Sequence, residues 1–105
     1  MKQKDYEIAI KLKKKLSELI PLVDLRVFGS RAREDADEYS DMDIFIEIES
    51  VNKELKDIIS DLTWEVGFEH FMVISPLIFS RDEIEKSPLK ASPIVKNILA
   101  EGIRI

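Results

Sequence analysis

Apolar residues recur along the first half of this chain with two different spacings. From about residue 3 to residue 20 they stand three or four positions apart, which predicts an amphipathic helix that Pro21 ends. Residues 22–28 predict a first strand. Along the next predicted strand, every second residue is apolar: Met42, Ile44, Ile46 and Ile48. This alternation directs those side chains toward a core and leaves the opposite side of the strand acidic.

The middle of the chain predicts a helix followed by strand structure. A turn over residues 49–52 leads into a second amphipathic helix, expected from about Lys53 to Val66. Gly67 is well placed to end this helix in the left-handed conformation. Residues 68–79 predict one or two strands, broken or bent near Pro76.

The C-terminal region carries clear helix boundaries. Ser80 and Glu83 have the pattern of a capping box, which opens a short helix. A last helix is expected to begin at Pro93 and to end at Gly102. Residues 103–105 then predict a short edge strand.

The resulting order of elements is helix, strand, strand, helix, strand and one or more helices. This order favours an α/β or α+β two-layer fold, with a small mixed β-sheet and helices packed on one face. We expect one domain over residues 1–105. The first strand and the acidic strand should be neighbours in the sheet, because the loop between them is short and costs little to close.

Composition and charge limit the possible partners. The 105 residues include 16 basic and 21 acidic ones, and the net charge of −5 argues against broad binding to nucleic acids or anionic membranes. The absence of cysteine excludes disulfides and thiolate metal sites. Because no signal-peptide pattern and no bilayer-spanning apolar stretch are visible, we expect a cytoplasmic protein.

Gly29 and Ser30 directly follow the first strand and form a candidate phosphate-binding turn. A glycine lets backbone approach a ligand closely, and the free N–H groups at a helix start favour an anion. Ser30 adds a hydroxyl donor, and Arg31 and Arg33 add the forked donors that suit phosphate. Taken alone, however, a Gly-Ser pair is usually an ordinary turn.

Asp41 and Asp43 stand at the beginning of the alternating strand, where residues two apart point to the same face. Two carboxylates at such close range repel each other, and a hard divalent cation such as Mg²⁺ relieves the repulsion. A pair of such ions supports phosphoryl or nucleotidyl transfer. The alternatives are a turn at Ser40-Asp41 with a solvated Asp43, and a calcium loop, although the glycine and spacing of an EF-hand are missing.

The two patterns together resemble a known signature. Gly-Ser, ten intervening residues, and Asp-Met-Asp followed by an apolar strand are similar to the signature of the polymerase-β-like nucleotidyltransferases. Within that superfamily, the segments 29–33 (Gly-Ser-Arg-Ala-Arg) and 40–44 (Ser-Asp-Met-Asp-Ile) resemble the minimal nucleotidyltransferase family. Its members are short catalytic cores, often antitoxins paired with helical HEPN-domain toxins.

The resemblance implies a role for each matching residue. The positions that match the family's nucleotide-binding turn are Gly29, Ser30, Arg33 and, less firmly, Arg31. Asp41 and Asp43 match its two catalytic, metal-binding carboxylates. The implied reaction transfers a nucleoside monophosphate, commonly AMP from ATP, to an acceptor hydroxyl, with two Mg²⁺ ions as cofactors. In antitoxin members the acceptor is a tyrosine of the partner toxin.

The sequence departs from the family pattern at two points. Glu34 stands where the family commonly has glycine, which would bring a negative charge near the phosphates. Active members also carry a third carboxylate on a neighbouring strand. Glu69, expected to begin the third strand, is our candidate, ahead of Glu65 in the preceding helix and Glu47 farther along the acidic strand. Without a third carboxylate, the alternative is a weak or inactive binding subunit that neutralises its partner by contact.

The aromatic residues Trp64, Phe68 and Phe71 allow two interpretations. They could stack on a nucleotide base, but we expect them to pack in the core. His70, the single histidine, could assist proton transfer beside Glu69, and we expect it to be a half-exposed packing residue instead.

Overall fold

Four strands form one mixed sheet in the order β3-β2-β1-β4 in the computed structural model, which describes all 105 residues. The elements are α1 (Gln3–Leu19), β1 (Leu22–Phe28), α2 (Ser30–Arg33), β2 (Met42–Ile48), α3 (Lys53–Glu69), β3 (Ile74–Ser80), α4 (Arg81–Lys86), the 3₁₀-helix η1 (Pro88–Ala91), α5 (Pro93–Glu101) and β4 (Ile103–Arg104). The predicted order of elements is therefore confirmed.

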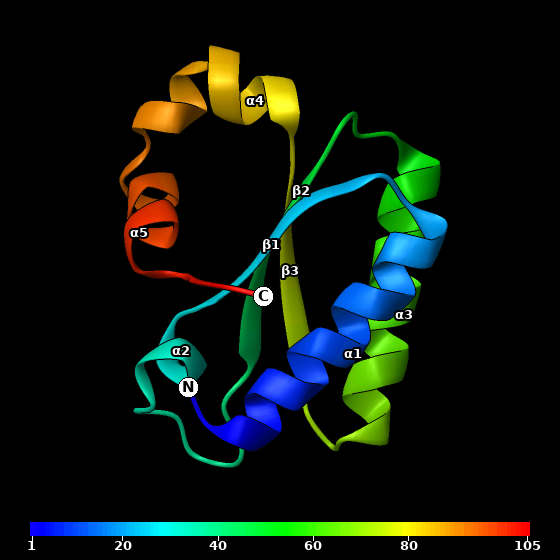
Figure 1. Ribbon diagram of the computed structural model, residues 1–105, viewed down its shortest axis with the longest axis vertical. Helices are drawn as coiled ribbons and strands as arrows, with labels where there is room; N and C mark the ends of the chain where they lie inside the picture. The colour runs from blue at the N-terminus through cyan, green and yellow to red at the C-terminus, as the bar shows by residue number, and fades with distance from the viewer.

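The sheet contains both strand directions. β1 is antiparallel to β2 and to β4, whereas β3 is parallel to β2. Figure 1 shows the three longer strands side by side, with α1 and α3 on one side of them and α4 and α5 on the other. The predicted small mixed sheet of an α+β fold is thus confirmed, and β1 and β2 are neighbours as expected. The helices cover both faces of the sheet and not one, because Phe45 makes the second face apolar in its middle.

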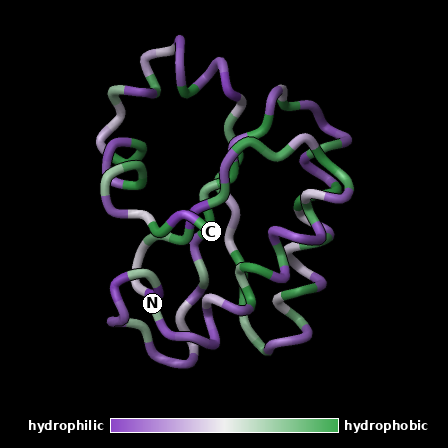
Figure 2. Tube along the Cα trace, viewed as in Figure 1, coloured by the Kyte–Doolittle hydropathy of each residue, from purple (hydrophilic) through white to green (hydrophobic).

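The larger core lies between the sheet and the helices α1 and α3. The four alternate apolar residues of β2 are completely buried there, as predicted. The helices contribute buried apolar side chains at three- and four-residue spacings: Ile8, Leu12, Leu16, Ile59 and Val66. Figure 2 shows the matching pattern, with hydrophilic segments on the outer turns of these helices. Burial of this one face fixes the register of β2, because a one-residue slip would turn its isoleucines to the other side.

A second, smaller core lies on the opposite face of the sheet. Phe45 is completely buried there and packs with Ile84 of α4 and with Val95 and Ile98 of α5. Its ring centroid lies 5.6 Å from that of Phe79 on β3. The side of β2 that we expected to be acidic is therefore apolar in its middle, and α5 covers it. On that side of β2, the carboxylate of Asp43 lies near the beginning of the strand, and Phe45 packs against the helices in its middle.

The prediction that Gly67 ends the second helix is wrong, because α3 continues to Glu69. The left-handed residue that follows the helix is Phe71, with φ of 56°. The Phe71 N–H donates to the Phe68 carbonyl and the Met72 N–H to the Gly67 carbonyl, which is the Schellman arrangement. Glycine is required at position 67 for a different reason. A Cβ there would lie 2.6 Å from the Met72 carbonyl oxygen, so a side chain would collide with the segment that leaves the helix.

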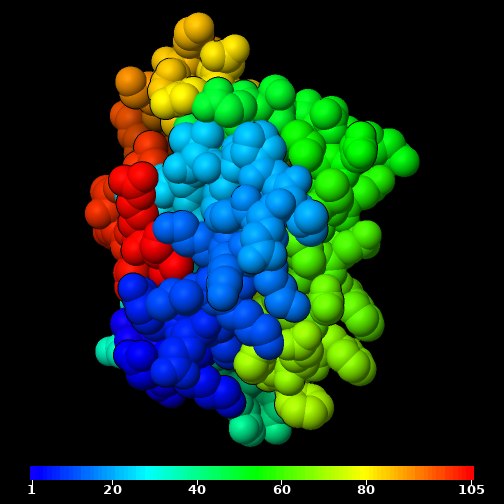
Figure 3. Space-filling view, turned by 45° about the vertical axis from the view of Figure 1, so that its right-hand side comes forward, coloured from blue at the N-terminus to red at the C-terminus, as the bar shows by residue number.

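The remaining boundaries follow the sequence signals. The capping box of Ser80 and Glu83 opens α4, and Pro93 begins α5. Pro76 lies within a single strand, which tolerates it because β3 is at the edge of the sheet. Figure 3 shows the C-terminal segment against α1, where the Lys13 ammonium donates to the Ile105 carbonyl at 2.6 Å. None of the helices has the length and apolar character that crossing a membrane requires.

Candidate functional site

The glycine turn and the acidic strand meet where β1 ends and β2 begins. Phe28 pairs with Asp43 in the sheet, so Gly29 lies directly beside the Asp43 side chain. Gly29 has φ of 73° and ψ of −154°, a conformation that other residues rarely adopt. A Cβ on Gly29 would lie 2.6 Å from Oδ2 of Asp43. Glycine is thus required twice, once for the turn and once for the close approach of the carboxylate.

Asp41 and Asp43 interact as a like-charged pair. Asp41 is exposed just before β2, and Asp43, the second residue of β2, is half-buried. Burial, and then the Asp41 charge, raise the pKa of the Asp43 carboxyl, while the nearby Arg33 lowers it. Neither aspartate takes part in an ion pair within the protein. Two close carboxylates without a cationic partner are a donor set that fits a hard divalent cation.

The two arginines after the turn have different surroundings. Arg31 is buried and its guanidinium binds the Asp5 carboxylate at 2.9 Å and the Ser40 carbonyl at 2.8 Å. Its donors are therefore used inside the protein, where they fasten the loop before Asp41 to α1. Arg33 is exposed and pairs with Asp35 at 3.1 Å on the surface. Of the two arginines predicted to bind nucleotide, only Arg33 presents its guanidinium to solvent near Asp43.

A small cavity of about 290 Å³ adjoins the glycine turn. It separates the turn and α2 from α5, and its lining residues are Phe28, Gly29, Ala32, Arg33, Ile94, Asn97, Ile98 and Glu101. Sequence reasoning did not identify Asn97 and Glu101. Both stand on the predicted last helix without any local motif, so only the packing of α5 across the sheet reveals their position.

Glu69 does not join the aspartates. It is the last residue of α3, not the first of β3, so its predicted place on a strand is wrong. Its carboxylate binds the Lys11 ammonium of α1, and this hydrogen bond lowers the pKa of Glu69. Lys15 of α1 approaches both Glu65 and Glu69. These glutamates thus link the two helices that cover the sheet face away from Asp43.

No third carboxylate takes the place that we predicted for Glu69. The residue beside Asp43 on the neighbouring strand is Ser75. No cluster of three or more acidic, histidine or cysteine side chains suited to a metal ion occurs in the structure. Glu47 lies beyond the buried Phe45 on the same side of β2, where burial and then Asp24 raise the pKa of its carboxyl. The carboxylate pair therefore stands with a hydroxyl group as its neighbour on β3.

Glu34 has a local structural explanation. It follows α2 in the left-handed conformation, with φ of 63°, which glycine adopts more easily than other residues. Its carboxylate binds the N-terminal ammonium of Met1 at 3.3 Å.

The aromatic residues of α3 are not in the core, and that prediction is wrong. Trp64 and Phe68 are both 69% exposed and Phe71 is 95% exposed. The buried stripe of α3 instead contains Ile59, Thr63 and Val66. The aromatic side chains line a groove between α3 and β3 that is separate from the cavity at the glycine turn.

Comparison with known proteins agrees with this geometry. The family model described as "Nucleotidyltransferase domain" matches residues 9–105, which include the glycine turn, both aspartates and all four strands. No curated protein matches the chain. The four-stranded mixed sheet with its helices is consistent with a polymerase-β-like nucleotidyltransferase core. The chain therefore belongs to the nucleotidyltransferase domain family.

Proposed function

We propose that this protein is a Mg²⁺-dependent nucleotidyltransferase that transfers a nucleoside monophosphate, AMP from ATP, to a hydroxyl of a partner protein. In this proposal the partner is a helical HEPN-type toxin and the protein is its antitoxin. The observation that carries the proposal is the contact between the two sequence motifs. The Gly29 turn lies against the Asp43 carboxylate on the adjacent strand, in a chain of the nucleotidyltransferase family.

Each residue of the site has a chemical task in this reaction. The backbone at Gly29 and Ser30, the Ser30 hydroxyl and the Arg33 guanidinium bind the β- and γ-phosphates. Asp41 and Asp43 would hold two Mg²⁺ ions, which neutralise charge on the phosphates when bound. The acceptor oxygen attacks the α-phosphorus, and the bond from that phosphorus to the bridging oxygen breaks. Pyrophosphate leaves, and the acceptor proton passes to solvent.

The alternative is a binding subunit with little or no catalytic activity. A specific observation favours it: the neighbour of Asp43 on β3 is Ser75, and Glu69 is ion-paired to α1. A hydroxyl cannot supply the negative charge of a third carboxylate to a metal ion or accept the acceptor proton as readily. In this reading the protein neutralises its partner by contact alone.

One set of variants separates the two functions. Purified protein is incubated with ATP labelled on the α-phosphate, Mg²⁺ and the product of the neighbouring gene, and label on that partner is measured. The enzyme proposal expects transfer by the wild type and at least a hundredfold loss in Asp41→Asn and Asp43→Asn. Asp82→Asn is the matched control, because Asp82 is an exposed aspartate on α4 that pairs with Lys86.

Ser75→Asp adds the missing carboxylate beside Asp43. Greater transfer by this variant than by the wild type would show that the carboxylate pair is a weakened catalytic centre. Absence of transfer by the wild type and by Ser75→Asp, with partner inhibition retained in Asp43→Asn, would support the binding subunit and refute the enzyme.

A further inference from the structure

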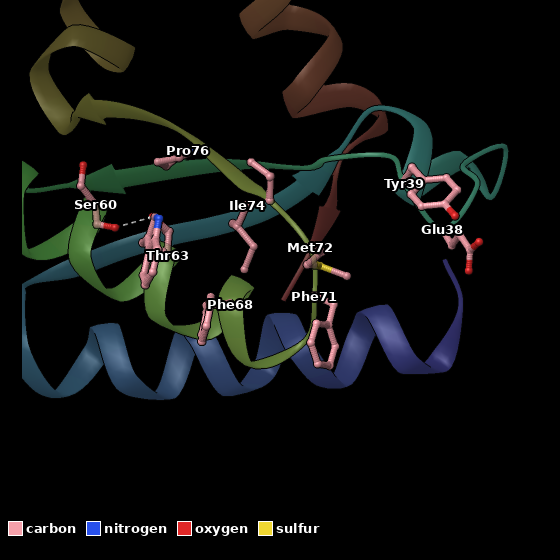
Figure 4. A pocket seen from close by; sticks show the side chains of 11 residues that line it. Glu38, Tyr39, Ser60, Thr63, Phe68, Phe71, Met72, Ile74 and Pro76 are labelled. Atoms are coloured by element: carbon pink, nitrogen blue, oxygen red, sulfur yellow. Dashed lines mark hydrogen bonds between the residues drawn. The ribbon is translucent and has the colours of Figure 1, made fainter.

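An open groove of about 590 Å³ lies between α3 and β3. Figure 4 shows it running from Ser60 and Thr63 at one end to Tyr39 and Glu38 at the other. Its lining is mainly apolar and includes Tyr39, Trp64, Phe68, Phe71, Ile74 and Pro76. The groove is therefore an extended apolar depression on the surface.

The aromatic side chains of this groove do not stabilise the fold by burial. Trp64 and Phe68 stack with their ring centroids 5.1 Å apart and their planes 8° from parallel, yet both remain largely exposed. Tyr39 is 85% exposed at the loop end of the groove. Contiguous exposed apolar surface of this kind marks interaction sites, and tryptophan and tyrosine are enriched among the residues that dominate binding energy.

The edge of the sheet favours a helix over a strand as the occupant. β3 is an edge strand, so an extended segment could in principle pair with it. Pro76 stands in the middle of this strand and lines the groove, and it offers no N–H to a pairing strand. An amphipathic helix needs no backbone donors from its receptor, because its apolar face fills the groove.

Charge defines one end of the occupant. Glu38 is the only charged residue that lines the groove. It belongs to a loop, residues 34–41, that contains five acidic residues and no basic residue. Neither Glu38 nor Asp41 forms an ion pair within the protein. A complementary helix therefore carries lysine or arginine at the end that lies against this loop.

The groove reaches the loop that leads to the carboxylate site, because Tyr39 lines the groove and lies two residues before Asp41. Its β3 residues Ile74 and Pro76 are on the α3 side of the sheet, so the loop, and not the strand, joins the two places. We infer that the groove is the docking surface for the acceptor protein, which inserts an amphipathic helix with a basic end. The identification of this occupant as the acceptor rests on the proposed function, whereas its helical and basic character rests on the groove alone.

The first experiment identifies the occupant in the native host. A photoreactive phenylalanine analogue replaces Phe71, and the same analogue at Leu19, an α1 residue that is 59% exposed, is the control. Mass spectrometry maps the crosslinked peptide. We expect one dominant partner, linked through an amphipathic helical segment with basic residues at one end, from position 71 only. A second copy of this chain, an extended segment, or no product beyond that of position 19 would overturn the inference.

The second experiment measures binding with the purified partner. Trp64 is the only tryptophan, so its fluorescence should shift to shorter wavelength when the groove is filled. Phe68→Ser should raise the dissociation constant at least tenfold, while Leu19→Ser and Asp43→Asn should leave it unchanged. Equal binding by Phe68→Ser and the wild type would refute the groove, and circular dichroism checks that the variant is folded. Binding that depends on Phe68 without any nucleotide transfer would refute the proposed enzyme and leave the docking surface intact.

Discussion

Replacing Gly29 with alanine should destabilise the protein and displace the Asp43 carboxylate in one step. The positive φ of 73° with ψ of −154° costs a residue with a side chain about 1–3 kcal/mol. The new Cβ would lie 2.6 Å from Oδ2 of Asp43, much closer than van der Waals contact. Rotating the carboxylate away from its preferred conformation adds about 0.5–1.5 kcal/mol. The total cost is about 1.5–4.5 kcal/mol.

A double-mutant cycle separates the two contributions. Gly29→Ala is introduced into the wild type and into Asp43→Ala, where no carboxylate obstructs the new methyl group. The backbone cost remains in both, so the destabilisation should be about 1 kcal/mol smaller in the Asp43→Ala background. Urea unfolding followed by far-ultraviolet circular dichroism is the suitable assay, because the exposed Trp64 is a poor reporter of unfolding.

Two results would refute this reasoning. A total destabilisation below about 1 kcal/mol would mean that the turn is not restricted to glycine. An equal cost in both backgrounds would mean that the Asp43 carboxylate does not lie against Gly29. The second result would also remove the contact on which the proposed nucleotide site depends.

Three further predictions concern single residues. Glu47→Gln should raise the melting temperature at pH 7, because burial raises the pKa of Glu47 in the folded protein. The native state therefore binds the proton more tightly than the unfolded state, and wild-type stability falls as the pH rises from the unfolded pKa through the raised one. Thermal unfolding from pH 4 to pH 8 should show a flatter stability profile for the variant than for the wild type. Phe71→Gly should stabilise the protein by about 0.5–1 kcal/mol in urea unfolding, because glycine adopts the left-handed position after α3 without strain. Glu69→Gln should leave nucleotide transfer unchanged in the labelled-ATP assay, since Glu69 pairs with Lys11; a large loss of transfer would contradict this placement.

Local signals in the sequence were sufficient for most of the fold. The apolar residues at every even position of β2 identified its main buried face, although Phe45 at an odd position is buried on the other face as well. The capping box at Ser80 and the proline at position 93 marked helix starts that depend on adjacent residues alone. The closeness of Gly29 and Asp43 followed from the short connection between two antiparallel strands.

The errors come from residues whose role depends on distant parts of the chain. A glycine that follows the apolar stripe of a helix indicates either the end of the helix or a place where another backbone segment passes close by. For Gly67 the second explanation holds, because the chain returns at Met72 and its carbonyl oxygen leaves no room for a side chain. The apolar residues of α3 exceed the width of one buried stripe, so the pattern could not tell that Trp64 and Phe68 face outward. Arg31 and Arg33 look alike in sequence, and only Asp5 on α1 distinguishes the buried one.

Arg31 connects the groove and the carboxylate site. Its guanidinium binds the Asp5 carboxylate and the carbonyls of residues 37, 38 and 40, and so it fixes the whole loop that carries both Glu38 and Asp41. Arg31→Lys keeps a charge for Asp5 but cannot span several carbonyls with one planar group. The variant should therefore weaken both Mg²⁺-dependent nucleotide binding and partner binding.

The other variants should divide these two effects. Phe68→Ser should weaken partner binding alone, and Asp43→Asn should weaken nucleotide binding alone. Isothermal titration with ATP and Mg²⁺, together with Trp64 fluorescence for the partner, measures each. Loss of only one kind of binding in Arg31→Lys would contradict the shared loop. That result would mean that the two sites are positioned independently. If they share the loop, loss of the Arg31 guanidinium should release the Glu38 carbonyl and the Ser40 carbonyl together.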